Sequence, residues 1–309
     1  MKKTLLTAYR QRALFCMALP AIILIIMFCY VPLYGIIVAF KDFDFSLGIG
    51  GSQWNGLENF RYLVGMGNKT WRIVRNTMGY WALNTLTGTA CNLILAIALN
   101  ECRKKYFKKV THTIMIFPTF ISFVAVTFMV EALLKSNGGL INQMLAMFGK
   151  APVRWYRESK YWPVILTIVN LWKNTGYGCI LYLSALAGMD TEIFEAAEID
   201  GASRLRQIWH ISIPQLMSMI SIMLIMGVAN IMRSNTGLHY LVTKNQTMLH
   251  PTVQTIDAYV FDSLKGTGEL SSKFGIQAAI TFFQMIIGST LVIITNAIVN
   301  KIEPANALF

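Results

Sequence analysis

Charged side chains are scarce in this sequence. Its 309 residues include 15 Asp and Glu and 27 Lys and Arg, which together make 14% of the chain. Soluble domains contain roughly 25% charged residues, so this composition excludes an ordinary water-soluble globular protein. Hydrophobic residues make up 55% of the chain, and they occur in segments about as long as a bilayer is thick. We therefore expect an all-α integral membrane protein.

Motifs for disulfides, metals and nucleotides are missing as well. The five cysteines form no C-x-x-C pair, and they do not show the pattern of a secreted disulfide framework. The four histidines do not share the spacing of metal ligands, so we expect no metal site. The phosphate-binding motif G-x-x-x-x-G-K-[ST] is absent. No cluster of nucleophile, acid and base is recognisable either. The chain is therefore expected to be non-catalytic and to bind no cofactor itself.

The apolar segments predict six transmembrane helices. They lie at about residues 14–40, 76–99, 110–134, 162–187, 213–232 and 276–299. The first segment is longer than the apolar region of a signal peptide, which has about 7 to 15 residues, so we interpret it as a retained span. No segment is long and polar enough to form a separate soluble domain. Residues 1–309 are thus expected to form a single transmembrane domain.

Basic residues predict how these helices are oriented. The second loop contains Arg103, Lys104, Lys105, Lys108 and Lys109, whereas the basic residues of the three long opposite loops are spread out. Dense basic loops face the cytoplasm, so we place this loop and both chain termini there. The same rule accounts for the net charge of +12, which is therefore no argument for a nucleic-acid partner.

One hydrophilic segment, residues 190–213, has the pattern of two short helices. Asp190 or Thr191 can cap a first helix, and negative charge is favoured near a helix N-terminus. We expect its early part to contain Glu192, Glu195 and Glu198. Gly201 then permits a break. The second helix has an apolar stripe that consists of Leu205, Ile208, Trp209 and Ile211. The pattern predicts a two-helix cytoplasmic loop.

Two interpretations of this loop are open. It can lie as an amphipathic segment on the lipid surface, or it can dock onto another protein. The small pair Ala196-Ala197 allows close approach of a partner backbone, and the flanking carboxylates can pair with Arg or Lys of that partner. The abundance of acidic residues disfavours an anionic lipid surface, so protein docking is the preferred interpretation.

The same loop resembles a known signature. Glu195-Ala196-Ala197, Asp200-Gly201-Ala202, Ile211 and Pro214 match the spacing E-A-A-x-x-D-G-A-(8)-I-x-x-P, which is similar to the cytoplasmic motif of permease subunits of bacterial ABC importers. The segments 40–43, 54–60, 99–101, 171–174 and 295–296 resemble the carbohydrate-uptake branch of that family, which works with lipoprotein-type oligosaccharide-binding proteins. The likeness is weakest over 227–255, where Asn230-Ile231-Met232-Arg233 replaces the usual aromatic-acidic segment.

The resemblance implies a fold, a function and partners. It implies the ABC importer permease fold, with 190–213 as the coupling loop. A second, non-identical permease subunit would complete the pore, an ABC ATPase dimer would bind Mg-ATP, and an external solute-binding protein would deliver sugar. The coupling residues that it implies are Glu195, Ala196, Ala197, Glu198, Asp200, Gly201 and Ala202. A permease for another solute, such as an amino acid or phosphate, is the alternative within the family, and an ion-coupled secondary transporter is the alternative outside it.

Polar residues inside apolar spans are the candidates for a substrate pathway, because they are costly in lipid and tend to face a cavity or another helix. Lys173 and Asn174 can hydrogen-bond sugar hydroxyls, and the neighbouring Trp172 and Tyr177 can stack on a sugar ring. The alternative for Lys173 is a structural partner, either Glu131 or backbone carbonyls. Four further candidates, which can instead bond across helices, are Trp81, Asn84, Asn230 and Gln284.

Overall fold

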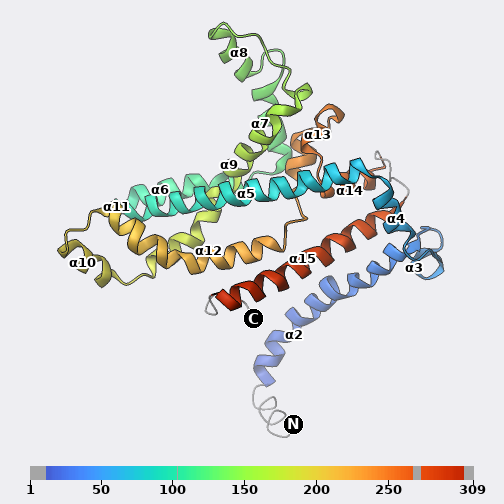
Figure 1. Ribbon diagram of the computed structural model, residues 1–309, viewed down its shortest axis with the longest axis horizontal. Helices are drawn as coiled ribbons and strands as arrows, with labels where there is room; N and C mark the ends of the chain where they lie inside the picture. Colours follow the sequence, from blue (N-terminus) through green and yellow to red (C-terminus); the bar gives the residue numbers. More distant parts are fainter. Residues whose placement is uncertain (1–11, 103, 267–272, 303–309) are drawn as a thin grey trace.

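The computed structural model describes residues 12–102, 104–266 and 273–302 (Figure 1). Arg103, one of the basic residues on which the predicted orientation depends, lies outside these residues. The described chain is almost entirely helical. Its two short strands, β1 (Lys41–Asp42) and β2 (Gln53–Trp54), form an antiparallel pair in which Lys41 lies opposite Trp54.

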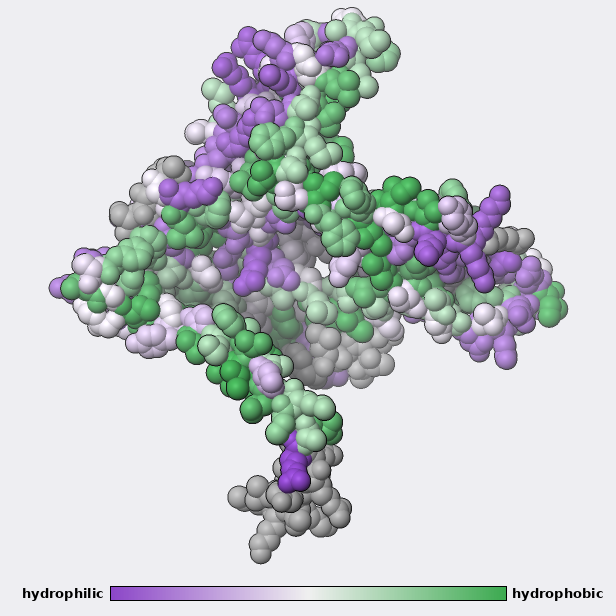
Figure 2. Space-filling model, turned by 180° about the vertical axis from the view of Figure 1, so that it is seen from behind, coloured by the Kyte–Doolittle hydropathy of each residue, from purple (hydrophilic) through white to green (hydrophobic). Residues whose placement is uncertain are grey.

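An extended N-terminal helix projects from the rest of the molecule. It consists of α2 (Arg12–Ile25), the π-helix η1 (Ile26–Tyr30) and the 3₁₀-helix η2 (Val31–Phe40). Only η2 packs closely against α15 (Phe274–Ile302). The hydrophobic side chains of α2 that the structure describes are exposed, and Figure 2 shows hydrophobic residues over this projecting helix. A helix with so much exposed apolar surface needs lipid or a protein partner around it.

The second predicted span is longer than its apolar segment. After α3 (Gly48–Gly51) and α4 (Glu58–Gly65), helix α5 runs over Asn68–Glu101 and so begins well before the expected residue 76. Asn59 of α4 donates hydrogen bonds to the carbonyls of Ala39 (2.9 Å) and Lys41 (3.0 Å). These bonds fix α4 to the end of the N-terminal helix.

The third predicted span is not one straight helix, which corrects the expectation for 110–134. Helix α6 (Lys105–Ile116) and the 3₁₀-helix η3 (Phe117–Phe120) are followed by α7 (Phe123–Leu134), and the two parts are bent by 99°. Ile121 has extended backbone angles, and the Ser122 hydroxyl caps α7 by accepting the Ala125 N–H at 3.2 Å. Proline at the start of η3 and a strong N-cap explain the break.

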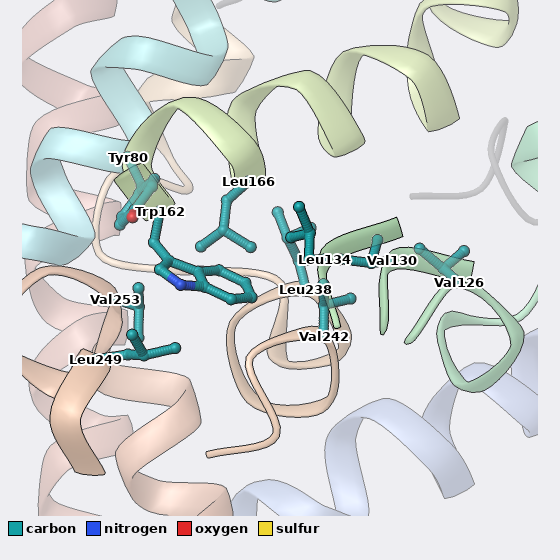
Figure 3. Packing of buried hydrophobic residues seen from close by; sticks show 10 residues of the cluster. All are labelled: Tyr80, Val126, Val130, Leu134, Trp162, Leu166, Leu238, Val242, Leu249 and Val253. Atoms are coloured by element: carbon teal, nitrogen blue, oxygen red, sulfur yellow. The ribbon is translucent and has the colours of Figure 1, made fainter. Parts of the chain in front are cut away.

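Helix α9 (Trp162–Ala187) has the predicted bounds of the fourth span and runs beside α5. It follows α8 (Leu140–Met147), η4 (Trp155–Arg157) and η5 (Ser159–Tyr161). The Trp162 indole lies at the centre of a buried cluster drawn in Figure 3, which joins α9 to α5, to α7 and to the segment 238–253. Its N–H donates to the Trp155 carbonyl at 2.8 Å, so this buried donor is satisfied.

The remaining elements lie between α9 and the C-terminal helix. They are α10 (Thr191–Ile199), α11 (Arg204–Gln207), η6 (Ile208–Ser212), α12 (Ile213–Val228), η7 (Gly237–Val242), η8 (Thr247–Leu249), α13 (His250–Val253) and α14 (Ile256–Leu264). Helix α12 ends at Val228, four residues before the expected end of the fifth span at residue 232. It packs on α15.

By length and composition, the described residues contain four helices able to cross a membrane, or five if the bent pair α6–η3 and α7 counts as one span. They are residues 12–40, 68–101, 204–228 and 274–301, with 105–134 as the bent pair. Helix α9 is not among them. Asn170, Lys173 and Asn174 lower its mean hydropathy, although much of the helix is packed inside the protein.

Candidate functional site

The segment between α9 and α12 forms an exposed two-helix loop. Asp190 is the N-cap of α10, because its carboxylate accepts the Glu192 N–H at 2.9 Å. Gly201 has φ = +75° after α10, a conformation in which glycine is favoured. Ser203 then caps α11 by accepting the Arg206 N–H at 3.4 Å. The loop lies at one end of the molecule, far from α3 and α4 (Figure 1).

Residues of the predicted coupling motif face solvent on this loop. Glu195, Ala196, Glu198, Asp200 and Gly201 are exposed, and Ala197 and Ala202 are half-buried. Apolar residues beside them are exposed too, including Ile199 (87%), Leu205 (65%) and Trp209 (62%). Hydrophobic side chains on the protein surface next to carboxylates are typical of a docking surface.

Lys173 is buried in the interior, at 5% exposure, and its ammonium group donates to backbone carbonyls. The acceptors are the carbonyls of Pro118 (3.1 Å), Thr119 (2.9 Å) and Ile121. An ammonium group has three donors, so these carbonyls use its hydrogen-bonding capacity. The Thr119 hydroxyl donates back to the Lys173 carbonyl at 2.7 Å. We call this group of residues the lysine clamp.

The lysine clamp lies where α6–η3 ends and α7 begins. Carbonyls at the C-terminal end of a helix lack intrahelical partners and carry partial negative charge. Lys173 supplies donors to the Thr119 and Ile121 carbonyls and a positive charge at this point, whereas the Pro118 carbonyl also accepts the Ile121 N–H at 3.1 Å. Helix α9 can approach this point closely because residue 176 is glycine, and a Cβ at that position would overlap the Met115 carbonyl. Of the two interpretations of Lys173, the geometry favours the structural one, with carbonyls as partners.

Glu131 does not pair with Lys173. Its carboxylate forms an ion pair with Lys244, and both side chains are about one-third exposed. Of the acidic residues in the sequence, Glu131 came closest to being an intramembrane carboxylate. Its charge is already paired with that of Lys244, which follows η7. This arrangement removes the one residue that pointed to an ion-coupled transporter.

A polar cavity of about 420 Å³ lies where α5, α9 and the segment after α12 meet. Three of the sequence-predicted pathway residues line it: Trp81, Asn84 and Asn230. The Trp81 indole N–H donates to the Gly227 carbonyl at 2.8 Å, which joins α5 to α12 and leaves the ring as a cavity wall. Asn84 has a buried amide oxygen with no hydrogen-bond partner in the described structure. Such an orphaned acceptor is costly unless water or a ligand satisfies it.

Other polar residues of this cavity were missed by sequence reasoning. They are Tyr80, Thr85, Asn170, Arg233, Ser234, Asn235 and His239. Asn170 carried a signal, since it precedes Asn174 by one helical turn, and Asn174 indeed donates to the Asn170 side chain at 2.8 Å. Tyr177 follows on the same face at helical spacing and is exposed. Asn174 and Tyr177 thus continue the polar lining along α9.

Trp172 and Gln284 lie elsewhere. Trp172 lines a different, mainly apolar depression, between α5, α6 and α9. Gln284 is buried in α15, where its amide donates to the Met232 carbonyl (2.5 Å) and to Asp257 (3.4 Å). The structure therefore separates the eight pathway candidates into two groups. Five lie at or beside the polar cavity, namely Trp81, Asn84, Asn174, Tyr177 and Asn230. The other three, Trp172, Lys173 and Gln284, lie outside it.

The electrostatics of the polar cavity depend on Arg233 and His239. His239 is buried, its Nδ1 lies 3.2 Å from the Val253 carbonyl, and its ring packs edge-on against Tyr80. Burial lowers the pKa of His239 to about 4, so the ring is neutral at neutral pH. Among the described residues that line the cavity, Arg233 carries the one positive charge. No group of three His, Cys, Asp or Glu in the described chain could hold a metal ion.

Comparison with known proteins gives this geometry a context. Residues 88–306 match the family described as binding-protein-dependent transport system inner membrane component. The chain is 31% identical to the polygalacturonan/rhamnogalacturonan transport system permease protein YteP of Bacillus subtilis (strain 168), over 97% of this chain and 91% of YteP. It is 29% identical to Protein LplB of the same organism, over 95% of this chain and 90% of LplB.

Solved structures agree with the sequence comparison. A chain from the crystal structure of a bacterial ABC transporter involved in the import of the acidic polysaccharide alginate superposes with a TM-score of 0.85 and 26% identity, covering 97% of this chain and 99% of that one. A second structure of the bacterial alginate ABC transporter, in complex with alginate pentasaccharide-bound periplasmic protein, gives a TM-score of 0.84. The ABC permease fold expected from the loop signature is thereby confirmed. The chain belongs to the family of binding-protein-dependent transport system inner membrane components.

Proposed function

We propose that this chain is the permease subunit of an ATP-driven importer that carries oligosaccharides across the bacterial cell membrane. The observation that carries the proposal is the exposed α10–α11 loop, because it combines the motif of the family with apolar side chains that are exposed to solvent. The substrate class is supported by the relatives, whose names refer to polygalacturonan, rhamnogalacturonan, trehalose and maltose, and by the alginate importer.

The membrane topology that we propose has six spans in a single permease domain. They comprise residues 12–40, 68–101, the bent pair 105–134, 162–187, 204–228 and 274–302. Helix α9 is included although its hydropathy is low, because its polar residues face the lysine clamp and the polar cavity rather than lipid. Both termini are then cytoplasmic, on the same side as the α10–α11 loop.

The α10–α11 loop is the proposed coupling element. Glu195 to Gly201 would enter a groove of a partner ATPase, with Glu195 forming an ion pair there. Closure of the ATPase dimer around Mg-ATP would then move the loop together with α9 and α12, which flank it in sequence. Since this chain lacks a phosphate-binding motif, ATP binding and hydrolysis belong to the ATPase, and this chain is not an enzyme.

The remaining partners complete the pore and deliver the substrate. The apolar surface of α2 is exposed. Lipid would cover one part of this surface, and a second, non-identical permease would cover the other part. An external solute-binding protein would release sugar into the polar cavity, where Asn84, Asn170 and Asn230 can hydrogen-bond hydroxyls and Trp81 offers an aromatic wall. The face of α9 that carries Asn174 and Tyr177 would continue the path.

Co-purification and transport test this function. The tagged chain, isolated in mild detergent, should bring an ATPase and a second permease, and the complex in proteoliposomes should take up an oligosaccharide only with Mg-ATP and the binding protein. Glu195→Lys and Gly201→Pro should leave insertion and ATPase binding measurable but uncouple hydrolysis from uptake. Glu158→Lys, a charge reversal in the loop before α9, is the matched control. Wild-type uptake in both loop variants, or isolation of the chain with no ATPase even after crosslinking at the loop, would contradict the proposal.

A further inference from the structure

Arg233 differs from Lys173 because its charge is not used within the described structure. The side chain is exposed, and within the described residues its guanidinium has neither an ion pair nor a hydrogen bond, although it lines the polar cavity. Lys173 is the other cation that the sequence places near a pathway, but its donors are taken by three carbonyls. Arg233 is therefore a cation that remains available to a ligand in the pathway.

The backbone that carries Arg233 is held on both sides. On one side, Met232 is buried and its carbonyl accepts the Gln284 amide. On the other side, the Ser234 N–H and hydroxyl both donate to Asp257, at 2.5 and 3.1 Å. These bonds also use the Asp257 carboxylate, which makes no ion pair with Arg233. The guanidinium is thus presented from a fixed position and is not a side chain on a free loop.

The groups around Arg233 have complementary abilities. The cavity provides the amides of Asn84, Asn170, Asn230 and Asn235, which can donate to and accept from hydroxyl groups. Amides alone would not distinguish a neutral sugar from a charged one. A guanidinium binds a carboxylate with two parallel hydrogen bonds, and such charge-assisted pairs are stronger than neutral ones. One cation among several amides therefore fits a hydroxyl-rich ligand that carries a carboxylate.

We propose that Arg233 selects carboxylate-bearing, uronate-type oligosaccharides by pairing with one sugar carboxylate as the chain passes through the polar cavity. This inference rests on the proposed function and adds the class of sugar and the residue that determines it. It also explains why position 233 departs from the aromatic-acidic segment that is usual at this place in the family that the sequence resembles. An acidic residue at this point would repel the ligand.

The test compares two probes in the complete complex with its ATPase, second permease and binding protein in proteoliposomes. The probes are trigalacturonate and its methyl ester, which have the same sugar skeleton with and without negative charge. Initial uptake rates are measured for wild type, Arg233→Gln and Arg233→Lys, with Arg157→Gln as a matched exposed-arginine control. Because the binding protein is the same throughout, its own preference cancels when variants are compared.

We expect Arg233→Gln to lower trigalacturonate uptake at least about tenfold, the factor that corresponds to a lost charge-assisted hydrogen bond, while uptake of the ester stays within about twofold of wild type. Arg233→Lys should retain an intermediate rate. An unchanged yield of assembled complex and an unchanged thermal midpoint in detergent establish that the variants are folded. An equal fall for both probes, or no fall for either, would overturn the inference, as would a wild-type complex that transports the ester but not the acid. A wild-type complex that takes up neither probe and no neutral oligosaccharide would instead overturn the proposed function.

Discussion

Lys173 and Arg233 are two cations of the same permease whose surroundings are opposite. Lys173 is buried, and its ammonium group donates to three carbonyls where α6–η3 meets α7. Arg233 is exposed in a polar cavity and has no partner within the described chain. The difference indicates that a polar side chain near the membrane interior is available to substrate only if its hydrogen bonds are not already used. The lysine clamp is therefore assigned to structure and the arginine to recognition.

The largest expected effect comes from breaking the lysine clamp. Lys173→Met removes the donors and leaves buried carbonyls unsatisfied, which should lower the free energy of unfolding by about 3 kcal/mol or more. The level of assembled complex and its thermal midpoint in detergent should fall together. Lys173→Arg, which keeps the charge, should be less severe. A Lys173→Met complex of normal stability that loses only sugar uptake would place this lysine in the pathway.

A second way to disturb the lysine clamp is to separate its helices. Gly176→Ala puts a Cβ against the Met115 carbonyl, so α6 and α9 must move apart. We expect a loss of stability of about 1 to 3 kcal/mol. Gly88→Ala in α5, where a Cβ meets nothing within 4 Å, is the control and should be neutral or slightly stabilising. Equal thermal midpoints for the two variants would contradict the close approach of α6 and α9.

The pH dependence of His239 tests the charge of the polar cavity. The folded pKa of about 4 lies below the ordinary value of 6.5, so the unfolded chain binds more protons between these values. The stability contribution of the neutral ring is therefore full above pH 6.5 and is lost as the pH falls toward 4, by on the order of 3 kcal/mol in total. The thermal midpoint of wild type should decrease more between pH 7.5 and 5 than that of His239→Gln. Parallel curves would mean that His239 is not buried as a neutral ring.

The smallest expected effect concerns the cavity wall. Trp81→Phe keeps an aromatic ring but removes the indole N–H that donates to the Gly227 carbonyl. This should lower the free energy of unfolding by about 1 kcal/mol. Because α5 and α12 then hold the cavity less firmly, we expect a few-fold rise in the KM for sugar together with this small loss of stability. Trp71→Phe, at an exposed position of α5, should leave KM unaltered. The reverse ranking of these two variants would remove Trp81 from the site.

Local features of this structure were predictable from the sequence, and distant contacts were not. Hydropathy located the apolar helices, and Asp190 and Gly201 indicated a short helix followed by a break, because caps and positive φ angles depend on neighbouring residues. The bend after η3 was missed, since averaging over a long apolar segment conceals a proline and a serine cap. The partners of Lys173 come from residues 118–121, more than 50 positions away in the sequence. The position of Lys173 within an apolar segment therefore could not decide between a structural role and contact with substrate.

The cavity was only partly predictable for the same reason. Trp81, Asn84 and Asn230 stood out as polar residues within apolar segments, whereas Arg233 and Asn235 follow the end of α12 and looked like loop residues. Their position depends on the bonds from Ser234 to Asp257 and from Gln284 to Met232. These bonds join segments that no local pattern relates.

The most direct test of the central claim is substrate protection of introduced cysteines. Asn230→Cys lies in the polar cavity, whereas Trp172→Cys lies in the apolar depression beside the lysine clamp. Labelling by a water-soluble thiol reagent is quantified by mass spectrometry, so that the native cysteines can stay in place, in the vanadate-trapped complex with and without oligosaccharide. The account predicts several-fold protection of Asn230→Cys and none of Trp172→Cys. Protection of Trp172→Cys with full labelling of Asn230→Cys would contradict it.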